Sequence, residues 1–326
     1  MRALALFSGG LDSSLAIKMV KNQGIEVIAL NFVSYFFGGK NERADKAAKD
    51  LGVQIEYIDF KEIHKEIVLN PPSGYGKNMN PCIDCHALMI KVAGGLMEKY
   101  GASFIITGEV LGQRPMSQNS QALKRVEKLS GMEGYLVRPL SAKIMPVTIP
   151  EEKGWLDRSK LGDLNGRGRT RQMELAEKMG VVDYPSPGGG CLLTDPGYSK
   201  RLKLLKQDGM FEKIEMFDLI KTGRFYRIES GKYLIVARDE GHNQKLPEYF
   251  EKSSFNISSG QTAGPTIVGI GEFSEEDIHT AKELFARYSK TKGKGETYLR
   301  YNGEEESIDE IDHEKIEKFM KEYQIL

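Results

Sequence analysis

The stretch of sequence that decides the fold is Phe7-Ser8-Gly9-Gly10-Leu11-Asp12-Ser13-Ser14. It follows a short apolar run from Ala3 to Phe7, which is typical of a buried strand, and it leads into a predicted helix from Asp12 to Lys21. The glycines let the backbone turn tightly, so that its N–H groups and the positive end of the helix dipole point to one place. A strand, a glycine turn and a helix in this order predict a loop that binds an anion.

Phosphate is the anion that this loop suits best. The backbone would supply N–H donors, the serine hydroxyls would add hydrogen bonds, and Asp12 would hold Mg²⁺ against the phosphate oxygens. The predicted phosphate-binding residues are Ser8, Gly9, Gly10, Asp12, Ser13 and Ser14. The pattern is neither Gly-x4-Gly-Lys-[Ser/Thr] nor Gly-x-Gly-x-x-Gly. The structural alternative is a glycine turn in which Asp12 caps the helix.

Strands and helices alternate through the first 110 residues. Predicted strands cover residues 3–7, 25–33, 53–60 and 103–107, and predicted helices cover residues 12–21, 41–51 and 86–100. This alternation implies right-handed crossovers and an α/β fold with a doubly wound, mostly parallel sheet. Ligands bind such sheets at the carboxyl ends of the strands, which is where the glycine turn is predicted to lie.

The character of the sequence changes in the second half. Residues 111–206 are richer in loops, including Pro185 to Gly190, and end in a predicted helix over residues 198–206. Beyond residue 216, a hairpin (225–228 and 233–237), strands at 266–270 and 297–301, and helices at 275–288 and 312–323 form a smaller α+β unit. We therefore predict domains at residues 1–206 and 216–326, joined by a linker at 207–215.

Composition excludes several classes of protein. The chain has 326 residues, which suggests two domains, and its 46 Lys and Arg residues are balanced by 46 Asp and Glu residues. Any nucleic-acid site must therefore be local. No stretch approaches the roughly 18 apolar residues that span a membrane, and no signal peptide is recognisable at the N-terminus. We expect a cytoplasmic protein with no membrane contact.

Three cysteines form the second motif. The string Asn80-Pro81-Cys82-Ile83-Asp84-Cys85-His86 opens a predicted helix, and Cys191 follows a glycine-rich stretch. An odd number of cysteines without a secretion signal argues against a disulfide framework, and a helix N-terminus is expected to favour the thiolate. Three thiolates cannot close a four-coordinate zinc site alone, although His86 would be a strained fourth ligand. They can hold a [4Fe–4S] cluster through three of its irons.

The glycine loop resembles the pyrophosphate loop (PP-loop) of the N-type ATP pyrophosphatases. This resemblance implies an adenine nucleotide alpha hydrolase-like fold that binds ATP and Mg²⁺, adenylates a substrate oxygen and releases pyrophosphate. It also implies that the end of the second strand, at Asn31, lies where adenine and ribose bind. Members include tRNA thiolation enzymes, lysidine synthetase, deazaguanine nitrile synthase and glutamine-dependent amidotransferase synthetases.

The cysteine strings narrow the resemblance. Asn80-Pro81-Cys82-x-x-Cys85, followed by Ile106-Thr107-Gly108-Glu109, resembles the branch of tRNA 2-thiouridylases and 4-thiouridine synthetases. The stretches 108–118, 138–143 and 190–195 resemble short 4-thiouridine-synthetase-like proteins. The resemblance implies that Gly108 belongs to the nucleotide site and that Cys82, Cys85 and Cys191 hold a [4Fe–4S] cluster. In the alternative persulfide relay, Cys191 would carry sulfur and Cys85 would resolve it.

This resemblance predicts a tRNA uridine sulfurtransferase, with Asp12, Cys85 and Cys191 as catalytic residues. The sulfur donor would be inorganic sulfide or a cysteine desulfurase, and homodimer formation is left open. One alternative is an ATP-dependent amide- or nitrile-forming ligase of the same superfamily, although deazaguanine nitrile synthase normally has a four-cysteine zinc site. Another is a non-catalytic RNA-binding or sulfur-carrier protein.

RNA contacts are predicted from local charge and from a second resemblance. Residues from about 217 resemble, more weakly, the RNA-binding domain of NFACT proteins. Between residues 158 and 206, ten basic residues stand against five acidic ones, which is an electrostatic footprint for phosphates. The predicted RNA-binding residues are Arg114, Lys143, Arg167, Arg169 and Arg171.

Several remaining titratable residues receive individual predictions. His64, His279 and His313 lie in charged helical segments and are expected at the surface, and His242 is a weaker candidate for RNA contact. Asp84 would act as a general acid or base near the uridine, or, more commonly for such a position, as a carboxylate that stabilises a helix N-terminus.

Overall fold

Five parallel strands form the first sheet of the computed structural model, in the order β3-β2-β1-β4-β5. They are β1 (Arg2–Leu6), β2 (Glu26–Val33), β3 (Gln54–Asp59), β4 (Phe104–Ile106) and β5 (Leu136–Val137). All neighbouring pairs are parallel, which confirms the predicted doubly wound α/β architecture. The strand order reverses its direction at β1, so the loop after β1 lies at the switch point where such sheets bind ligands.

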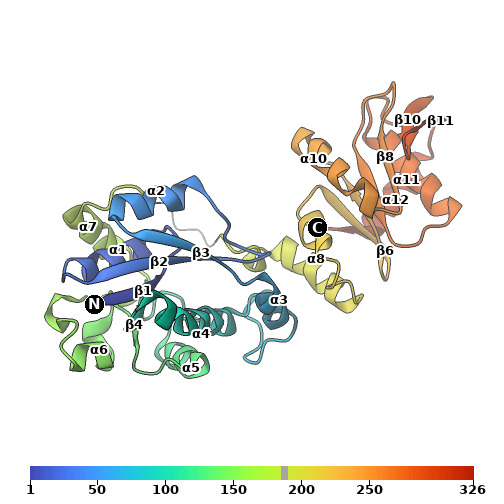
Figure 1. Ribbon diagram of the computed structural model, residues 1–326. Coiled ribbons are helices and arrows are strands. Elements are labelled where there is room, and N and C mark those ends of the chain that lie inside the picture. The colour runs from blue at the N-terminus through green and yellow to red at the C-terminus, as the bar shows by residue number, and fades with distance from the viewer. Residues whose placement is uncertain (185–189) are drawn as a thin grey trace. The chain divides into compact units, whose positions relative to one another are not determined.

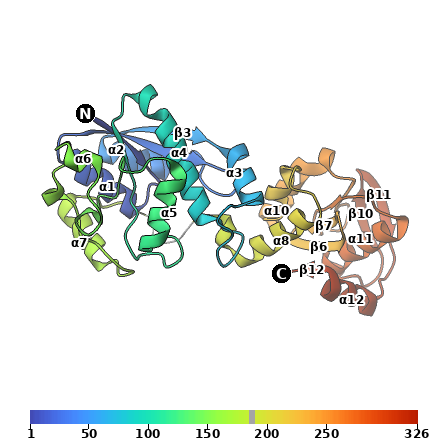
Figure 2. The ribbon, with the colours of Figure 1, turned by 90° about the horizontal axis from the view of Figure 1, so that it is seen from below.

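Helices cover both faces of this sheet (Figures 1 and 2). They are α1 (Leu11–Lys21), α2 (Glu42–Leu51), α3 (Lys61–Leu69), α4 (Cys82–Tyr100), α5 (Ser120–Ser130), α6 (Ile149–Glu152) and α7 (Thr170–Met179). Alternate residues of β1 enter two different cores. Ala3 and Ala5 pack in the core that contains α1, α2 and α7, whereas Leu4 packs in the core that contains α4 and α5. A central strand buried on both faces explains why its sequence is a continuous apolar run.

The second sheet is antiparallel between all neighbours and has the order β11-β10-β8-β9-β7-β6-β12. Its strands are β6 (Arg224–Glu229), β7 (Lys232–Val236), β8 (Phe255–Ser259), β9 (Ile267–Ile270), β10 (Thr297–Tyr301), β11 (Glu304–Ile308) and β12 (Gln324–Ile325). The accompanying helices are α8 (Pro196–Gln207), α9 (Glu215–Leu219), α10 (Glu240–Lys245), α11 (Glu275–Tyr288) and α12 (His313–Tyr323). The core contains Leu284 of α11 and Ile316 of α12. The separate antiparallel sheet confirms the predicted second α+β domain.

The structure describes residues 1–184 and 190–326, so most of the predicted loop from Pro185 to Gly190 lies outside the described residues. The chain divides into two compact units, Met1–Thr194 and Asp195–Leu326. Among the described helices, none is long and apolar enough to cross a membrane.

The division between the units falls before α8, whereas the sequence placed this helix in the first domain. Three hydrogen bonds, two of them buried, explain the difference. The Tyr198 hydroxyl donates to the Phe217 carbonyl oxygen at 3.1 Å. The Arg201 guanidinium donates to the carbonyl oxygens of Ile220 at 2.8 Å and Ile325 at 3.2 Å. These carbonyls belong to the second unit, so α8 folds with that unit and residues 207–215 are not a free linker.

A buried carboxylate fixes the end of α8 to the β6–β7 hairpin. Asp208 accepts hydrogen bonds from Arg227 at 2.7 and 2.9 Å, from the Ser230 hydroxyl at 2.9 Å and from the Tyr233 hydroxyl. The Asp208 side chain is 2% exposed. The Arg227 guanidinium, helped by the two hydroxyl donors, holds the pKa of this carboxyl well below its usual range. Asp208 is therefore an ionised anchor inside the second unit.

Candidate functional site

The glycine loop connects β1 to α1 and leaves the start of that helix open. Gly10 is the N-cap, and no side chain there accepts a hydrogen bond from the first turn. The alternative in which Asp12 caps the helix is therefore wrong, because Asp12 lies inside the first turn. The Ser13 hydroxyl donates to the Gly10 carbonyl oxygen at 2.9 Å, and the Gly10 N–H donates to the Ser8 hydroxyl at 3.3 Å. The loop is preorganised by its own side chains, with its helix end available to an anion.

Two other predicted residues shape the loop from neighbouring strands. A Cβ on Gly108, just beyond β4, would lie 2.5 Å from the Ser13 backbone nitrogen, so only glycine fits there. Asn31 is 4% exposed on β2, and its Nδ2 donates to the Phe7 carbonyl oxygen at 3.1 Å. Among the described residues, the Asn31 Oδ1 has no partner. The structure thus brings Asn31 and Gly108 to the loop, where both fix its backbone.

Asp12 contacts a residue that the sequence assigned to RNA. Its Oδ2 accepts hydrogen bonds from Arg169 at 2.9 Å and from Gln113 at 3.0 Å. Its Oδ1 is buried and has no hydrogen-bond partner within the described part of the chain. Arg169 precedes α7, which packs on α1, and this packing brings the two residues together. Asp12 therefore stands beside a guanidinium and retains one carboxylate oxygen for a cation such as Mg²⁺.

All three cysteines are free, and Cys82 and Cys191 lie close enough to Cys85 to affect the pKa of its thiol. Cys82 is the first residue of α4, Cys85 lies within its first turn, and Cys191 immediately precedes a short 3₁₀ helix, Leu192–Thr194. Burial raises the pKa of the Cys85 thiol well above its usual value, and the nearby thiols of Cys191 and Cys82 raise it further. Burial likewise raises the pKa of Cys191 to about 11. The expectation that the helix start favours the thiolate is therefore wrong for Cys85, because burial outweighs the helix dipole.

Backbone contacts hold the segment around Cys191 in place. The Leu192 N–H donates to the Phe36 carbonyl oxygen at 3.0 Å, and the Asn78 side-chain amide donates to the Thr194 carbonyl oxygen at 2.7 Å. The Thr194 hydroxyl donates to the Cys191 carbonyl oxygen at 2.7 Å. These bonds tie the third cysteine to the loop that precedes α4.

The three cysteines are residues that could hold a metal group. Among the described residues, no group of three or more His, Cys, Asp or Glu side chains is arranged to hold one ion. His86, predicted as a strained fourth zinc ligand, places its Nδ1 2.8 Å from a Glu109 carboxylate oxygen, a contact that metal-bound histidines also make through their second ring nitrogen. The three free thiols are ligands of the type that binds zinc or an iron–sulfur cluster.

Glu109, Arg138 and His86 form a network of charged and polar side chains next to α4. Glu109 is 5% exposed and accepts hydrogen bonds from Arg138 Nε at 3.0 Å and from the Thr107 hydroxyl at 3.1 Å. Burial alone would raise the pKa of Glu109, but Arg138 and His86 oppose it and lower the pKa to about 2. Arg138 also bonds a Glu127 oxygen at 3.1 Å. A carboxylate with so low a pKa acts only as an acceptor, so it orients the His86 ring through Nδ1.

Asp84 has a structural role in the geometry observed. It is 5% exposed, and its two oxygens accept hydrogen bonds from the Ser73 backbone at 2.8 Å and the Ser73 hydroxyl at 2.6 Å. Both carboxylate oxygens are therefore used to fix the loop before α4.

The five predicted RNA-binding residues differ in their exposure to solvent. Arg114, Lys143, Arg167 and Arg171 are exposed, whereas Arg169 is turned to the glycine loop. Arg171 is paired with Asp163. Arg114 lies close enough to Cys191 to oppose part of the rise in the pKa of that thiol. Arg114 is therefore the basic residue that the structure relates to the cysteines.

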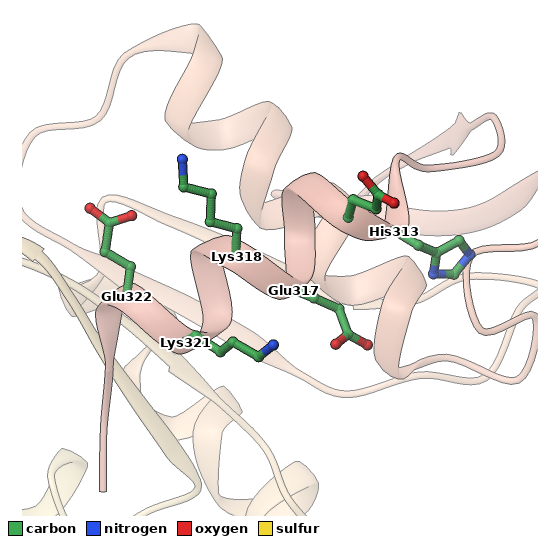
Figure 3. A pocket seen from close by; sticks show the side chains of 6 residues that line it. His313, Glu317, Lys318, Lys321 and Glu322 are labelled. Atoms are coloured by element: carbon green, nitrogen blue, oxygen red, sulfur yellow. The ribbon is translucent and has the colours of Figure 1, made fainter.

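Two surface hollows lie away from these residues. One is at the carboxyl ends of β2 and β3 and is lined by Val33, Lys40, Asp45, Ile55, Tyr57 and Asp59. The other hollow lies along α12 in the second unit and is lined mainly by lysines and glutamates (Figure 3). Neither hollow is lined by a residue that the sequence assigned to nucleotide, metal or RNA.

His64 is a buried residue that sequence reasoning placed at the surface. It is fully buried on α3, with its ring stacked on Phe60 and edge-on to Phe36 and Phe37. Its Nδ1 lies 2.7 Å from the Ser34 hydroxyl. Burial lowers the pKa of His64 to about 4, so the ring is neutral near pH 7. The run of aromatic residues at 35–37 was the signal in the sequence that could have identified the side chains against which His64 packs.

Comparison with known proteins finds a similar family for part of each unit. Residues 1–143 match the family described as thiamine biosynthesis protein (ThiI), and residues 223–323 match the NFACT protein RNA binding domain. A protein named "Probable tRNA sulfurtransferase" from Thermococcus kodakarensis is 31% identical over 145 residues, which are 43% of this chain and 36% of that protein. The first unit is thus similar over part of its length to ThiI and to a tRNA sulfurtransferase, and the second unit is similar to an RNA binding domain.

Other similar proteins share a lower sequence identity with this chain. The tRNA-specific 2-thiouridylase MnmA of Methylobacterium nodulans is 23% identical over 225 residues, covering 64% of this chain and 56% of that protein. A structure described as a 4-thiouridine synthetase–RNA complex with bound ATP is 18% identical, with a TM-score of 0.40, over 67% of this chain and 52% of that chain. This chain thus spans between about a third and just over half of the length of these curated relatives.

Proposed function

We propose that this protein is an ATP-dependent tRNA uridine sulfurtransferase. The observation that carries the proposal is the presence, in one unit, of an open PP-loop with Asp12 beside it and of three neighbouring free thiols. The match of residues 1–143 to ThiI and the named tRNA sulfurtransferase relative support the same reaction. We place its action in the cytoplasm, with tRNA and a sulfur donor, inorganic sulfide or a cysteine desulfurase, as partners.

The PP-loop would carry the first step. A uridine carbonyl oxygen is a poor leaving group, and its attack on the α-phosphorus of ATP would convert it to an adenylate and release pyrophosphate. The open N-terminus of α1 would stabilise the negative charge that builds on pyrophosphate. Asp12 would hold Mg²⁺ through the oxygen that has no protein partner among the described residues. Sulfur would then bond to the activated carbon, and AMP would leave with the former carbonyl oxygen.

The cysteines favour a cluster over the persulfide relay. Only a thiolate attacks a persulfide efficiently, and burial keeps the Cys85 thiol protonated at neutral pH. Metal coordination replaces the thiol proton, so the same burial is compatible with cluster ligation. A [4Fe–4S] cluster held by Cys82, Cys85 and Cys191 would leave one iron open to an external ligand such as sulfide.

The proposal is tested by mass spectrometry of tRNA nucleosides from a strain that lacks this gene. We expect a thiolated uridine to disappear and to return with the wild-type protein but not with Asp12→Ala. Asp163→Ala, which removes an exposed carboxylate of the same unit, is the matched control and should restore the nucleoside. An unchanged nucleoside profile in the deletion strain would contradict the proposal and favour the superfamily's ligase chemistry or a non-catalytic role.

The cluster is tested on the purified protein. Anaerobic reconstitution should give about four irons and four sulfides per chain, and Cys→Ala at any of the three positions should abolish cluster-dependent thiolation. Full thiolation by iron-free protein would exclude a role for the cluster in the reaction and would favour the persulfide relay.

A further inference from the structure

The loop between α11 and β10 carries three lysines at alternate positions. Lys290, Lys292 and Lys294 are all exposed. Within the described part of the chain, none of these ammonium groups lies within ion-pair distance of a carboxylate. The single carboxylate of this lysine loop (residues 289–296), that of Glu296, accepts a hydrogen bond from the Tyr298 hydroxyl at 2.6 Å.

Several charges around these lysines are paired. Acidic residues outnumber basic ones in the second unit, and three cations of α11 and α12 form ion pairs. These pairs are Lys282–Glu306, Arg287–Glu317 and Lys315–Glu283. The lysine loop is thus a local positive spot on a predominantly acidic unit. A spot of this kind attracts a polyanion while the rest of the unit repels it, which confines the contact to the loop.

The backbone of the loop turns through three residues with positive φ. Lys292 has φ of +54°, followed by Gly293 at +73° and Gly295 at +79°. A lysine in the left-handed region costs about 1 kcal/mol relative to glycine, which stands at the other positive-φ positions of this loop. The other described non-glycine residue with positive φ is Asn302, a type that tolerates this region. A non-glycine residue thus adopts a strained backbone conformation in this loop.

Buried contacts hold this shape. Hydroxyl groups form a chain from Ser289 to Thr291 at 2.8 Å and from Thr291 to Thr297 at 2.7 Å. The Gly293 carbonyl oxygen accepts the Ile311 N–H at 3.2 Å. The three ammonium groups therefore project from a fixed platform, and less conformational entropy is lost when they meet a ligand.

We propose that the lysine loop binds the phosphate backbone of tRNA. The proposal deepens the function proposed above, since it names where the second unit captures the RNA substrate. Residues 290–295 carry no aromatic or apolar side chain, so the loop would recognise the backbone charge and not the base sequence. Charge complementarity and the match of residues 223–323 to an RNA binding domain favour RNA over an acidic protein segment.

The test uses two double variants of the full-length protein with the same change in charge. Lys290→Gln/Lys294→Gln removes two loop charges, and Lys318→Gln/Lys321→Gln removes two charges from α12, where glutamates surround the lysines (Figure 3). Each phosphate contact contributes about 0.7–0.9 to the slope of log K against log salt. For two contacts this predicts roughly a 30-fold loss of tRNA affinity at 0.1 M salt, vanishing toward 1 M salt. The α12 variant should bind like wild type.

Filter binding without ATP, at several salt concentrations, measures the tRNA affinity of each variant and the slope of its salt dependence. Wild-type affinity and slope in the loop variant, or equal losses in the two variants, would overturn the proposal. A single Lys292→Gly variant adds a control on folding, because it should lower tRNA affinity while leaving thermal stability unchanged or higher. Thiolation is measured separately: loop-dependent tRNA binding without thiolation would contradict the proposed enzyme activity but not this site.

Discussion

Acidification is expected to destabilise the first unit through His64. The ring is enclosed by Phe36, Phe37 and Phe60, and its Nε2 has no hydrogen-bond partner among the described residues. Protonation would place a charge in this apolar enclosure. Burial therefore lowers the pKa from 6.5 to about 4 in the folded state, whereas the unfolded chain retains the ordinary value.

The sign and size of the effect follow from linkage. Between pH 6.5 and about 4, the unfolded chain binds the proton and the folded one does not, so the free energy of unfolding falls as pH falls. The stabilisation from this group is complete above pH 6.5 and is lost as pH decreases to about 4. At 1.36 kcal/mol per pH unit, the loss amounts to about 3 kcal/mol.

Urea unfolding at several pH values measures this loss. Trp155 is the only tryptophan of the chain and packs against the core of the first unit, so its fluorescence reports that unit. The wild-type midpoint should decrease steadily from pH 7 to pH 4. His64→Gln should have a lower midpoint at pH 7 but a much flatter dependence on pH, and His279→Gln, at an exposed position, should retain the wild-type dependence. Equal pH dependence in wild type and His64→Gln would refute the reasoning.

Three further substitutions test other contacts. Gly108→Ala should abolish ATP binding, measured by calorimetry, because the new Cβ would lie 2.5 Å from the Ser13 backbone nitrogen; wild-type affinity would contradict the packing described. Asp208→Asn should lower the stability of the second unit by about 2 kcal/mol, measured by thermal unfolding, because the anchor loses its charge-assisted hydrogen bonds; a change below 0.5 kcal/mol would show that the charge is dispensable. Arg138→Met should destabilise the first unit by about 3 kcal/mol and raise the pKa of Glu109, since a buried carboxylate loses its guanidinium; acid titration of urea unfolding measures both.

The sequence predicted those parts of the fold that depend on local patterns. The PP-loop was recognisable because strand, glycines and helix start are consecutive, and the alternation of elements up to β4 indicated the parallel sheet. Helices α3, α5, α6, α7, α9 and α10 and strands β5, β8, β11 and β12 were missed, since short or highly charged segments carry a weak periodic signal. The domain boundary was wrong because it depends on which unit α8 packs against.

The chemistry of the site was less predictable than its residue types. Arg169 was predicted to bind RNA, and its contact with Asp12 joins positions 157 residues apart and cannot be inferred from one sequence. His64 was predicted at the surface because its sequence neighbours are charged, although the helix turns it into an aromatic core. The thiol pKa of Cys85 followed burial, a tertiary property, and not its place in the helix.

The central place of β1 in its sheet has a consequence for the nascent chain. One edge of β1 pairs with β2 early, but the other edge must wait for β4, whose first residue is Phe104. About seventy residues separate β2 from β4, so at 5–20 residues per second the ribosome leaves that apolar edge bare for roughly 4–14 s. An unpaired strand edge invites association with other chains during this interval. The loop that follows β1 likewise reaches its final shape only after Gly108 has left the exit tunnel.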